Sequence, residues 1–274
     1  MRCVETLYVL PDIDETGIRS AIRLGLQYLD IRFIWLPESL REYKDNRGKP
    51  RKDLRDYVEL YPDRKDFQKL MNVAMPLRFW DEVTKEDGKR YYFNDEHALF
   101  FLNANGFGRI EYKNTKGKSI FVRVEDNVVR EVEPEEIKDF MLEFMEKRYL
   151  PIPLRNVVRK PNQLSEATLK GLKKLKLDFT DYDAESQFLF FRNKTIKVTG
   201  EEIREFRPGD TSQCVWEEKV IPHNFRLLPE PFQITWNKDN DTYDIEIYNQ
   251  DSLFFCYLIN ASRVHWQTEL ETRD

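Results

Sequence analysis

The chain has 274 residues, of which 41% are hydrophobic and 34% are charged, and its formal net charge is -5. This length and composition are enough for a sizeable core and favour two domains. Charges of both signs are interspersed, so the net charge neither favours nor excludes nucleic acid as a partner, and local basic patches have to decide. The three cysteines form no Cys-x-x-Cys pair, and neither a signal peptide nor a long apolar span is found, which predicts a cytoplasmic protein without membrane contact.

The stretch from Leu7 to Gly17 carries the clearest chemical signal. The apolar run from Leu7 to Leu10 predicts a strand buried on both faces, and the spacing of apolar residues from Ile18 predicts a helix that follows it. Asp12 and Asp14 would then lie where a strand hands over to a helix, the end at which α/β sheets bind ligands. Two carboxylates at this spacing repel each other unless a cation lies between them, and Mg²⁺ or Mn²⁺ is the cation expected. A solvated turn is the alternative.

Residues 31–36 predict a second strand that closes a βαβ unit. A polar, basic stretch follows, and it is either solvated or able to attract a polyanion. Its candidate nucleic-acid-binding residues are Lys44, Arg47, Lys49, Arg51 and Lys52. Asp53 then fits the N-cap of a helix that continues through Leu60.

These segments resemble the second half of a Toprim domain, the catalytic fold of bacterial-type primases and topoisomerases. The resemblance lies in Leu-Pro-Asp-Ile-Asp-Glu-Thr-Gly at residues 10–17, in a strand ending Trp-Leu-Pro, and in Lys-Asp-Leu-Arg-Asp-Tyr at residues 52–57. It implies that Asp12 and Asp14 are catalytic and bind Mg²⁺ (or Mn²⁺), with Asp53 as a further metal ligand. The family also uses a glutamate on an earlier strand and a preceding zinc-binding module, and neither has a counterpart here. The resemblance therefore implies a nucleotidyltransferase whose catalytic site is incomplete in this chain.

A second family fits the same aspartates. Asp12-Ile-Asp-Glu-Thr16 satisfies the Asp-x-Asp-x-Thr pattern of haloacid-dehalogenase-type phosphatases, which would make Asp12 a nucleophile and Asp14 a general acid/base. That fold requires further α/β units, whereas the chain becomes rich in strand patterns after residue 70. The phosphatase is therefore the less favoured hypothesis.

Residues 71–94 predict a linker with a turn in it. Beyond it the patterns predict a helix over 96–105, a hairpin or meander over 109–132 and a helix from Glu133 to Arg148. A helix within 162–176, a hairpin over 187–199, a strand pair over 232–248 and an apolar helix over 252–262 complete the expected order.

Part of this second region also resembles a known family. Leu-Phe-Phe-Leu-Asn-Ala-Asn-Gly-Phe at 99–107, Val-Arg-Val-Glu-Asp-Asn-Val-Val-Arg-Glu-Val at 122–132 and similar matches at 188–199 and 215–225 carry it. They are similar to the region ahead of the ATPase domain in primase-helicases of phages and mobile elements, which are related to the poxvirus-type superfamily 3 helicases.

The sequence thus predicts a partial Toprim-like α/β subdomain (residues 1–70), a linker (71–94) and an α+β pre-helicase domain with antiparallel hairpins (95–274). The resemblances imply a segment of a DNA primase-helicase, with Mg-dependent nucleotidyl transfer in the complete protein and an inactive or accessory role for this chain. They imply single-stranded DNA, nucleotides and a helicase/ATPase domain, downstream or in trans, as partners, and self-association as a homo-oligomer. A non-catalytic DNA-binding or scaffolding module is the alternative.

Overall fold

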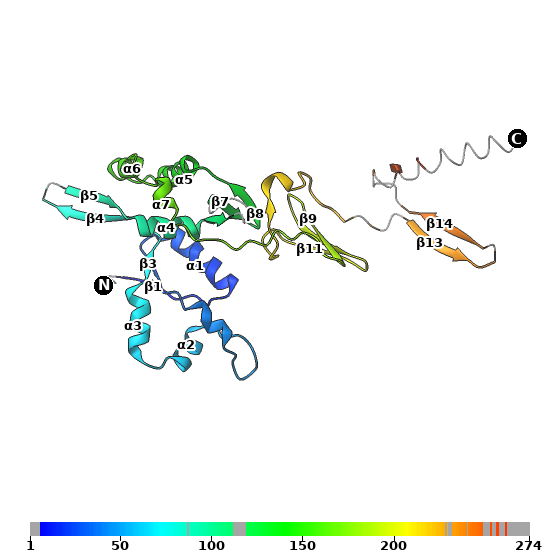
Figure 1. The fold of residues 1–274 in the computed structure, drawn as a ribbon, viewed down its shortest axis with the longest axis horizontal. Helices are drawn as coiled ribbons and strands as arrows, with labels where there is room; N and C mark the ends of the chain where they lie inside the picture. Colours follow the sequence, from blue (N-terminus) through cyan, green and yellow to red (C-terminus); the bar gives the residue numbers. More distant parts are fainter. Residues whose placement is uncertain are drawn as a thin grey trace.

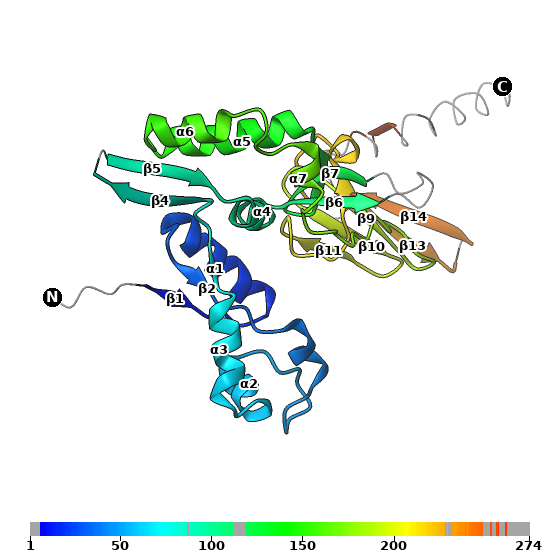
Figure 2. The same cartoon turned by 60° about the vertical axis from the view of Figure 1, so that its left-hand side comes forward.

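The computed structural model describes residues 6–86, 88–111, 119–227, 229, 232–239 and 241–248, together with 253, 256, 257 and 261. Figure 1 shows the N-terminal elements gathered on one side of the molecule, with helices α4 to α7 and the sheet that contains β7 and β8 beside them. The β4–β5 hairpin projects from this body in both views (Figures 1 and 2), and the β13–β14 hairpin lies apart from it (Figure 1).

The N-terminal part is a small mixed sheet flanked by short helices. Its strands run in the order β1-β2-β3, with β1 parallel to β2 and β2 antiparallel to β3. The predicted βαβ unit is therefore present. The bounds are β1 Tyr8–Val9, α1 Glu15–Gln27, β2 Arg32–Phe33, the 3-10 helix η1 Glu38–Glu42, α2 Leu54–Leu60, α3 Arg64–Asn72 and β3 Met75–Pro76.

One expectation for this sheet is wrong. The apolar run at residues 7–10 was predicted to be buried on both faces, but Leu7 is 55% and Tyr8 39% exposed. The reason is the strand order: β1 is at the edge, and the central, buried strand is β2, where Phe33 is 1% exposed. A run of apolar residues does not distinguish a central strand from an edge strand.

The segment expected as a linker contains strands. Strand β4 (Trp80–Lys85) pairs antiparallel with β5 (Gly88–Phe93), and Leu77, Phe79 and Trp80 are buried. Residues 71–94 are thus not a bare tether, because their apolar side chains belong to the main core. The division of the chain into two domains at these boundaries stays a prediction.

A mixed four-stranded sheet, in the order β12-β8-β7-β6, forms the middle of the molecule. The predicted meander and both predicted helices, α4 and α5, are present here. The bounds are α4 Asp95–Ala104, β6 Phe107–Glu111, β7 Ser119–Glu125, β8 Val128–Glu131, α5 Pro134–Lys147, α6 Ile152–Arg159 and α7 Glu166–Leu169. Only the four residues of α7 are α-helical within the stretch 162–176, where a helix was predicted.

The remaining elements follow the predicted hairpins. Strands β9 and β10 form the expected hairpin, to which β11 adds a third strand that the sequence patterns did not predict. The predicted helix at 252–262 lies almost entirely outside the described residues. The bounds are β9 Ser186–Phe190, β10 Thr195–Thr199, β11 Ile203–Phe206, β12 Val215–Trp216, the 3-10 helix η2 Glu217–Lys219, β13 Phe232–Asn237 and β14 Thr242–Ile247.

The main core is one continuous cluster. It joins Ala21 and Phe33 of the N-terminal part to Phe101 of α4 and to Met141 of α5, which are fully buried. A separate small cluster of Ile13, Leu36, Leu40 and Tyr57 lies at the end of β1. This second cluster packs the strand end against η1 and α2, and so brings the acidic turn and the basic stretch together. None of the helices in the described part of the chain combines the length and hydrophobicity that crossing a bilayer requires.

Candidate functional site at the end of the first strand

The turn between β1 and α1 places Asp12 and Asp14 at the carboxyl end of the strand, as predicted. Asp14 is the N-cap of α1, and its Oδ1 accepts a hydrogen bond of 2.8 Å from the backbone N–H of Gly17. This bond satisfies one of the helix's free N–H groups and fixes the side chain of Asp14. Ile13 between the two aspartates is buried, so it anchors the turn while both carboxylates remain accessible.

Lys52 supplies the cation that the aspartate pair requires. Its Nζ lies 2.5 Å from Oδ2 of Asp14 and 3.4 Å from Oδ2 of Asp12. The side chains are 47% (Lys52), 45% (Asp12) and 37% (Asp14) exposed, so water screens the three charges and each group has room to move.

The backbone of Lys52 is held from both sides. Its carbonyl oxygen accepts a hydrogen bond of 3.0 Å from the N–H of Ile13, and its own N–H donates to Oδ2 of Asp56 at 2.8 Å. The first bond joins the residue before α2 to the acidic turn. The second bond joins Lys52 to Asp56 in the first turn of α2. The ammonium therefore reaches the aspartates from a fixed anchor.

The pKa values reflect this pairing. The hydrogen bond from Lys52, followed by the N–H of Gly17, lowers the pKa of Asp14 below its ordinary value of 3.8. The hydrogen bond to Asp14 raises the pKa of Lys52 above its ordinary value of 10.5. Both groups are thus charged at every pH between the lowered pKa of Asp14 and the raised pKa of Lys52. The stabilising contribution of the pair is lost only as the pH falls through the lowered pKa of Asp14 or rises through the raised pKa of Lys52.

A close backbone approach explains the glycine in the first turn of α1. A Cβ added to Gly17 would lie 2.5 Å from the carbonyl oxygen of Asp12, a distance that real Cβ atoms do not tolerate. Only glycine lets the helix start this near to the strand end. Gly17 therefore positions both the N–H that Asp14 accepts and the backbone of Asp12.

The predicted basic stretch divides into two groups with different roles. Arg51 is largely buried, with its side chain 13% exposed, and its guanidinium donates to Glu59 at 2.6 Å and lies 3.8 Å from Asp56. It holds the loop to α2 and is not free to bind a ligand. Arg51 and Lys52, two of the five predicted nucleic-acid-binding residues, thus contact carboxylates of this chain.

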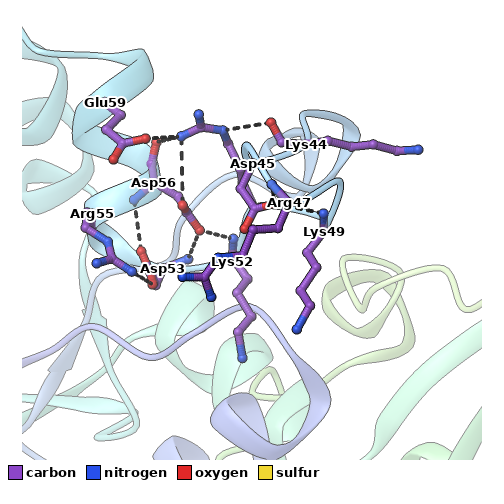
Figure 3. A network of polar contacts seen from close by, with 10 residues as sticks. Lys44, Asp45, Arg47, Lys49, Lys52, Asp53, Arg55, Asp56 and Glu59 are labelled. Carbon is purple, nitrogen blue, oxygen red and sulfur yellow. Dashed lines mark hydrogen bonds and ion pairs between the residues drawn. The ribbon is translucent and has the colours of Figure 1, made fainter.

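The other three predicted basic residues lie on an exposed loop. Asp45 accepts hydrogen bonds of 2.8 Å from the N–H groups of Arg47 and Lys49, which closes the loop into a tight turn. Within the described residues no ion pair engages the side chains of Lys44, Arg47 or Lys49. Figure 3 shows Lys44 and Lys49 extending away from the network around α2. The loop that carries these cations leads directly into Lys52, and the three side chains remain available to an anion.

Asp53, predicted as a third metal ligand, serves another purpose. It is the N-cap of α2 and accepts a hydrogen bond of 2.9 Å from the N–H of Asp56, while Asp56 reaches back to the N–H of Asp53. Lys52 extends away from this capping box (Figure 3). The structure brings together Asp12, Asp14 and Lys52, whereas Asp53 contacts its own helix and joins no group of three metal-binding side chains among the described residues. Its role as a metal ligand stays a prediction.

The sequence patterns did not predict that Lys52 would complete the pair. Lys52 stood in the basic stretch as a candidate for binding nucleic acid, 38 residues away from Asp14. Arg41 belongs to the same basic run but was not among the predicted binding residues, although its positive charge also contributes to lowering the pKa of Asp14. No short-range signal could have found Lys52, because its approach depends on the hydrogen bond between Ile13 and the carbonyl of Lys52, two segments far apart in the sequence.

A pair of substitutions separates the two roles of Asp14. Asp14→Ala removes both the helix cap and the partner of Lys52, and should lower the melting temperature by a few degrees. Asp14→Asn keeps an N-cap acceptor and removes only the charge, so it should recover most of that loss. Differential scanning calorimetry of both variants checks this. Equal losses for the two variants would show that the ion pair, and not the cap, stabilises the turn.

The arrangement can hold a divalent cation only if Lys52 moves. Two exposed carboxylates suit a Mg²⁺ or Mn²⁺ site in which water and phosphate oxygens supply most ligands. In the described part of the chain, no group of three or more His, Cys, Asp or Glu side chains surrounds a common metal position. The donor set therefore fits a metal that arrives together with a phosphate, and it does not fit an enclosed site made by protein alone.

Comparisons with known proteins add no family to these observations. No protein-family model matches the sequence, and the comparison with curated proteins finds no match.

Proposed function

We propose that this chain is a segment of a DNA replication protein of the primase-helicase type, which binds single-stranded DNA and nucleotides with Mg²⁺ or Mn²⁺ at the end of β1. The observation that carries the proposal is the convergence of Asp12 and Asp14 on Lys52, which follows a loop whose three basic side chains form no ion pair within the described residues. The resemblance to the second half of a Toprim domain supports the same assignment.

The acidic residues would bind the metal, and the basic residues would bind phosphate groups. Asp12 and Asp14 would hold the metal, and the metal would supply positive charge to the phosphate oxygens that it contacts. Lys52 balances one of the two negative charges until then, and it can turn toward the phosphate because about half of its side chain is exposed. Lys44, Arg47 and Lys49 attract the DNA backbone to this edge of the molecule.

An accessory role fits this chain better than independent catalysis. The two aspartates find no third carboxylate among the described residues, whereas nucleotidyl transfer in the Toprim family uses one. In the complete protein the missing group would come from another segment, and a helicase/ATPase domain or further copies of the chain would act with it in the cytoplasm. A purely DNA-binding or scaffolding module remains the second candidate, since the loop cations alone suffice for it.

DNA binding by the full chain tests the proposal. Fluorescence anisotropy with a labelled single-stranded oligonucleotide should show binding at low salt that weakens as salt is added. Replacing Lys44, Arg47 and Lys49 by Gln should reduce the slope of log affinity against log salt by up to about 2. A control that replaces the exposed Lys65, Lys147 and Lys170 by Gln loses the same charge elsewhere and should leave the slope nearly unchanged. Equal effects of the two triple variants, or no binding at low salt, would overturn the proposal.

Mn²⁺ binding distinguishes the metal-dependent replication protein from the purely DNA-binding or scaffolding module. Mn²⁺ binding, followed by electron paramagnetic resonance, should be lost in the Asp12→Asn, Asp14→Asn double variant. It should be stronger in Lys52→Met, because the competing ammonium is removed while much of the side-chain volume is kept. DNA binding without any Mn²⁺ effect would favour the non-catalytic module.

A further inference from the structure

A row of three side chains crosses the central sheet at one level. Phe107 of β6 lies opposite Arg123 of β7, and Arg123 lies opposite Arg130 of β8. Residues directly opposite on antiparallel strands point to the same face, which here is the face covered by α5. Two arginines in this relation repel each other, so a negative group between or above them is favoured.

The guanidinium of Arg123 packs against two aromatic rings that contact each other. Its Cζ lies 4.9 Å from the ring centre of Phe140 and 5.4 Å from that of Phe107. Its Nη2 contacts Glu125 at 3.2 Å, while its Nε is buried and has no hydrogen-bond partner among the described residues. A guanidinium has five N–H donors, so most of those of Arg123 are left for a ligand.

Arg130 is also only partly engaged. Its Nη1 donates to Glu136 at 2.9 Å, and the same carboxylate accepts the N–H of Glu133 in the capping box of α5. Glu136 therefore already serves two donors. The side chain of Arg130 is 43% exposed and can offer its remaining N–H groups to a ligand.

Two hollows meet at these arginines. One, of about 440 Å³, lies toward α5, and the other, of about 320 Å³, lies toward the turn after β9; Arg123 and Arg130 line both. Arg192, from that turn, lines the second hollow and is exposed, and no ion pair of its side chain is found within the described residues. Three separate segments thus bring arginines to one place.

We propose that Arg123, Arg130 and Arg192 bind a phosphodiester group of single-stranded DNA. The planar fork of arginine matches two phosphate oxygens, and unused donors on three arginines face the same hollows. Carboxylates also line them, namely Glu125, Asp126 and Glu217 in the second hollow and Glu136, Asp139 and Glu143 in the first. These repel a highly charged polyphosphate, so a group with one negative charge suits the site best. The ligand is the partner assigned under the proposed function, but the residues are independent of the aspartate pair and the basic loop.

Anisotropy titrations of the full chain with a labelled single-stranded oligonucleotide test the site. Arg130→Gln and Arg192→Gln should each weaken binding about tenfold and lower the salt slope by about 1. The control Arg204→Gln removes a 63% exposed arginine of β11 and should bind like the wild type. Arg123 is left unchanged because its packing against two core rings makes the variant prone to misfolding.

The outcomes distinguish this site from the proposed function. Binding by Arg130→Gln and Arg192→Gln equal to that of Arg204→Gln would overturn the site, whatever the loop variants do. Loss of binding in these variants with an intact response to Mn²⁺ would support it independently of the aspartates. Competition by ATP or inorganic phosphate at concentrations below those of oligonucleotide phosphate would show a free phosphate ligand and overturn the assignment to a phosphodiester.

Discussion

Phe33→Ala is expected to lower the free energy of unfolding by about 3–5 kcal/mol, the usual cost of removing a buried phenyl ring. Phe33 is 1% exposed and lies in the central strand β2. Its ring stacks on Trp35 with centres 5.6 Å apart and meets the edge of Phe100 at 6.1 Å. The lost contacts therefore belong to both the N-terminal sheet and α4.

Urea unfolding monitored by circular dichroism measures this effect. The control Tyr28→Ala truncates an aromatic residue that is 61% exposed, and it should change the stability by at most about 0.5 kcal/mol. Because the main core runs through both halves of the chain, one cooperative transition should shift as a whole. Two transitions, of which only one moves, would show instead that the N-terminal part unfolds as a separate domain.

Gly17→Ala should destabilise the protein by about 1–3 kcal/mol, although alanine is the better helix former by about 1 kcal/mol. The opposing term is the contact of the new methyl group with the carbonyl oxygen of Asp12 at 2.5 Å. A backbone carbonyl next to the buried Ile13 cannot rotate aside as a flexible side chain can. The strand end and the helix must separate, which moves Asp12 away from Lys52.

Two readouts check this second expectation. Chemical denaturation gives the change in stability, and Mn²⁺ affinity reports on the spacing of Asp12 and Asp14. Gly200→Ala is the matched control, because a Cβ there meets no atom within 4 Å and the backbone has no positive φ. A Gly17→Ala protein as stable as Gly200→Ala would mean that the strand end and α1 can move apart without cost. The glycine would then not be required for the close contact with the carbonyl of Asp12.

Local patterns predicted much of the fold correctly. The N-cap at Asp53, the helix α5 with Pro134 in its first turn, and the β9–β10 hairpin all follow from short-range signals. Each depends on residues within a few positions of one another, where backbone hydrogen bonding dictates the result.

The failures concern relations between distant segments. The exposure of Leu7 and Tyr8 depends on which strands lie beside β1, and the burial of Phe79 and Trp80 depends on helices that follow later. The site shows the same limit. The proximity of Asp12 and Asp14 follows from their spacing, whereas the approach of Lys52 requires the hydrogen bond between Ile13 and the carbonyl of Lys52.

The ammonium between Asp12 and Asp14 is a counter-ion attached to the chain. A carboxylate pair that depended on dissolved ions for neutrality would lose its shape whenever a chelator removed them. We therefore expect the strand end to keep its conformation in EDTA. A divalent ion that bound there would have to displace this tethered competitor.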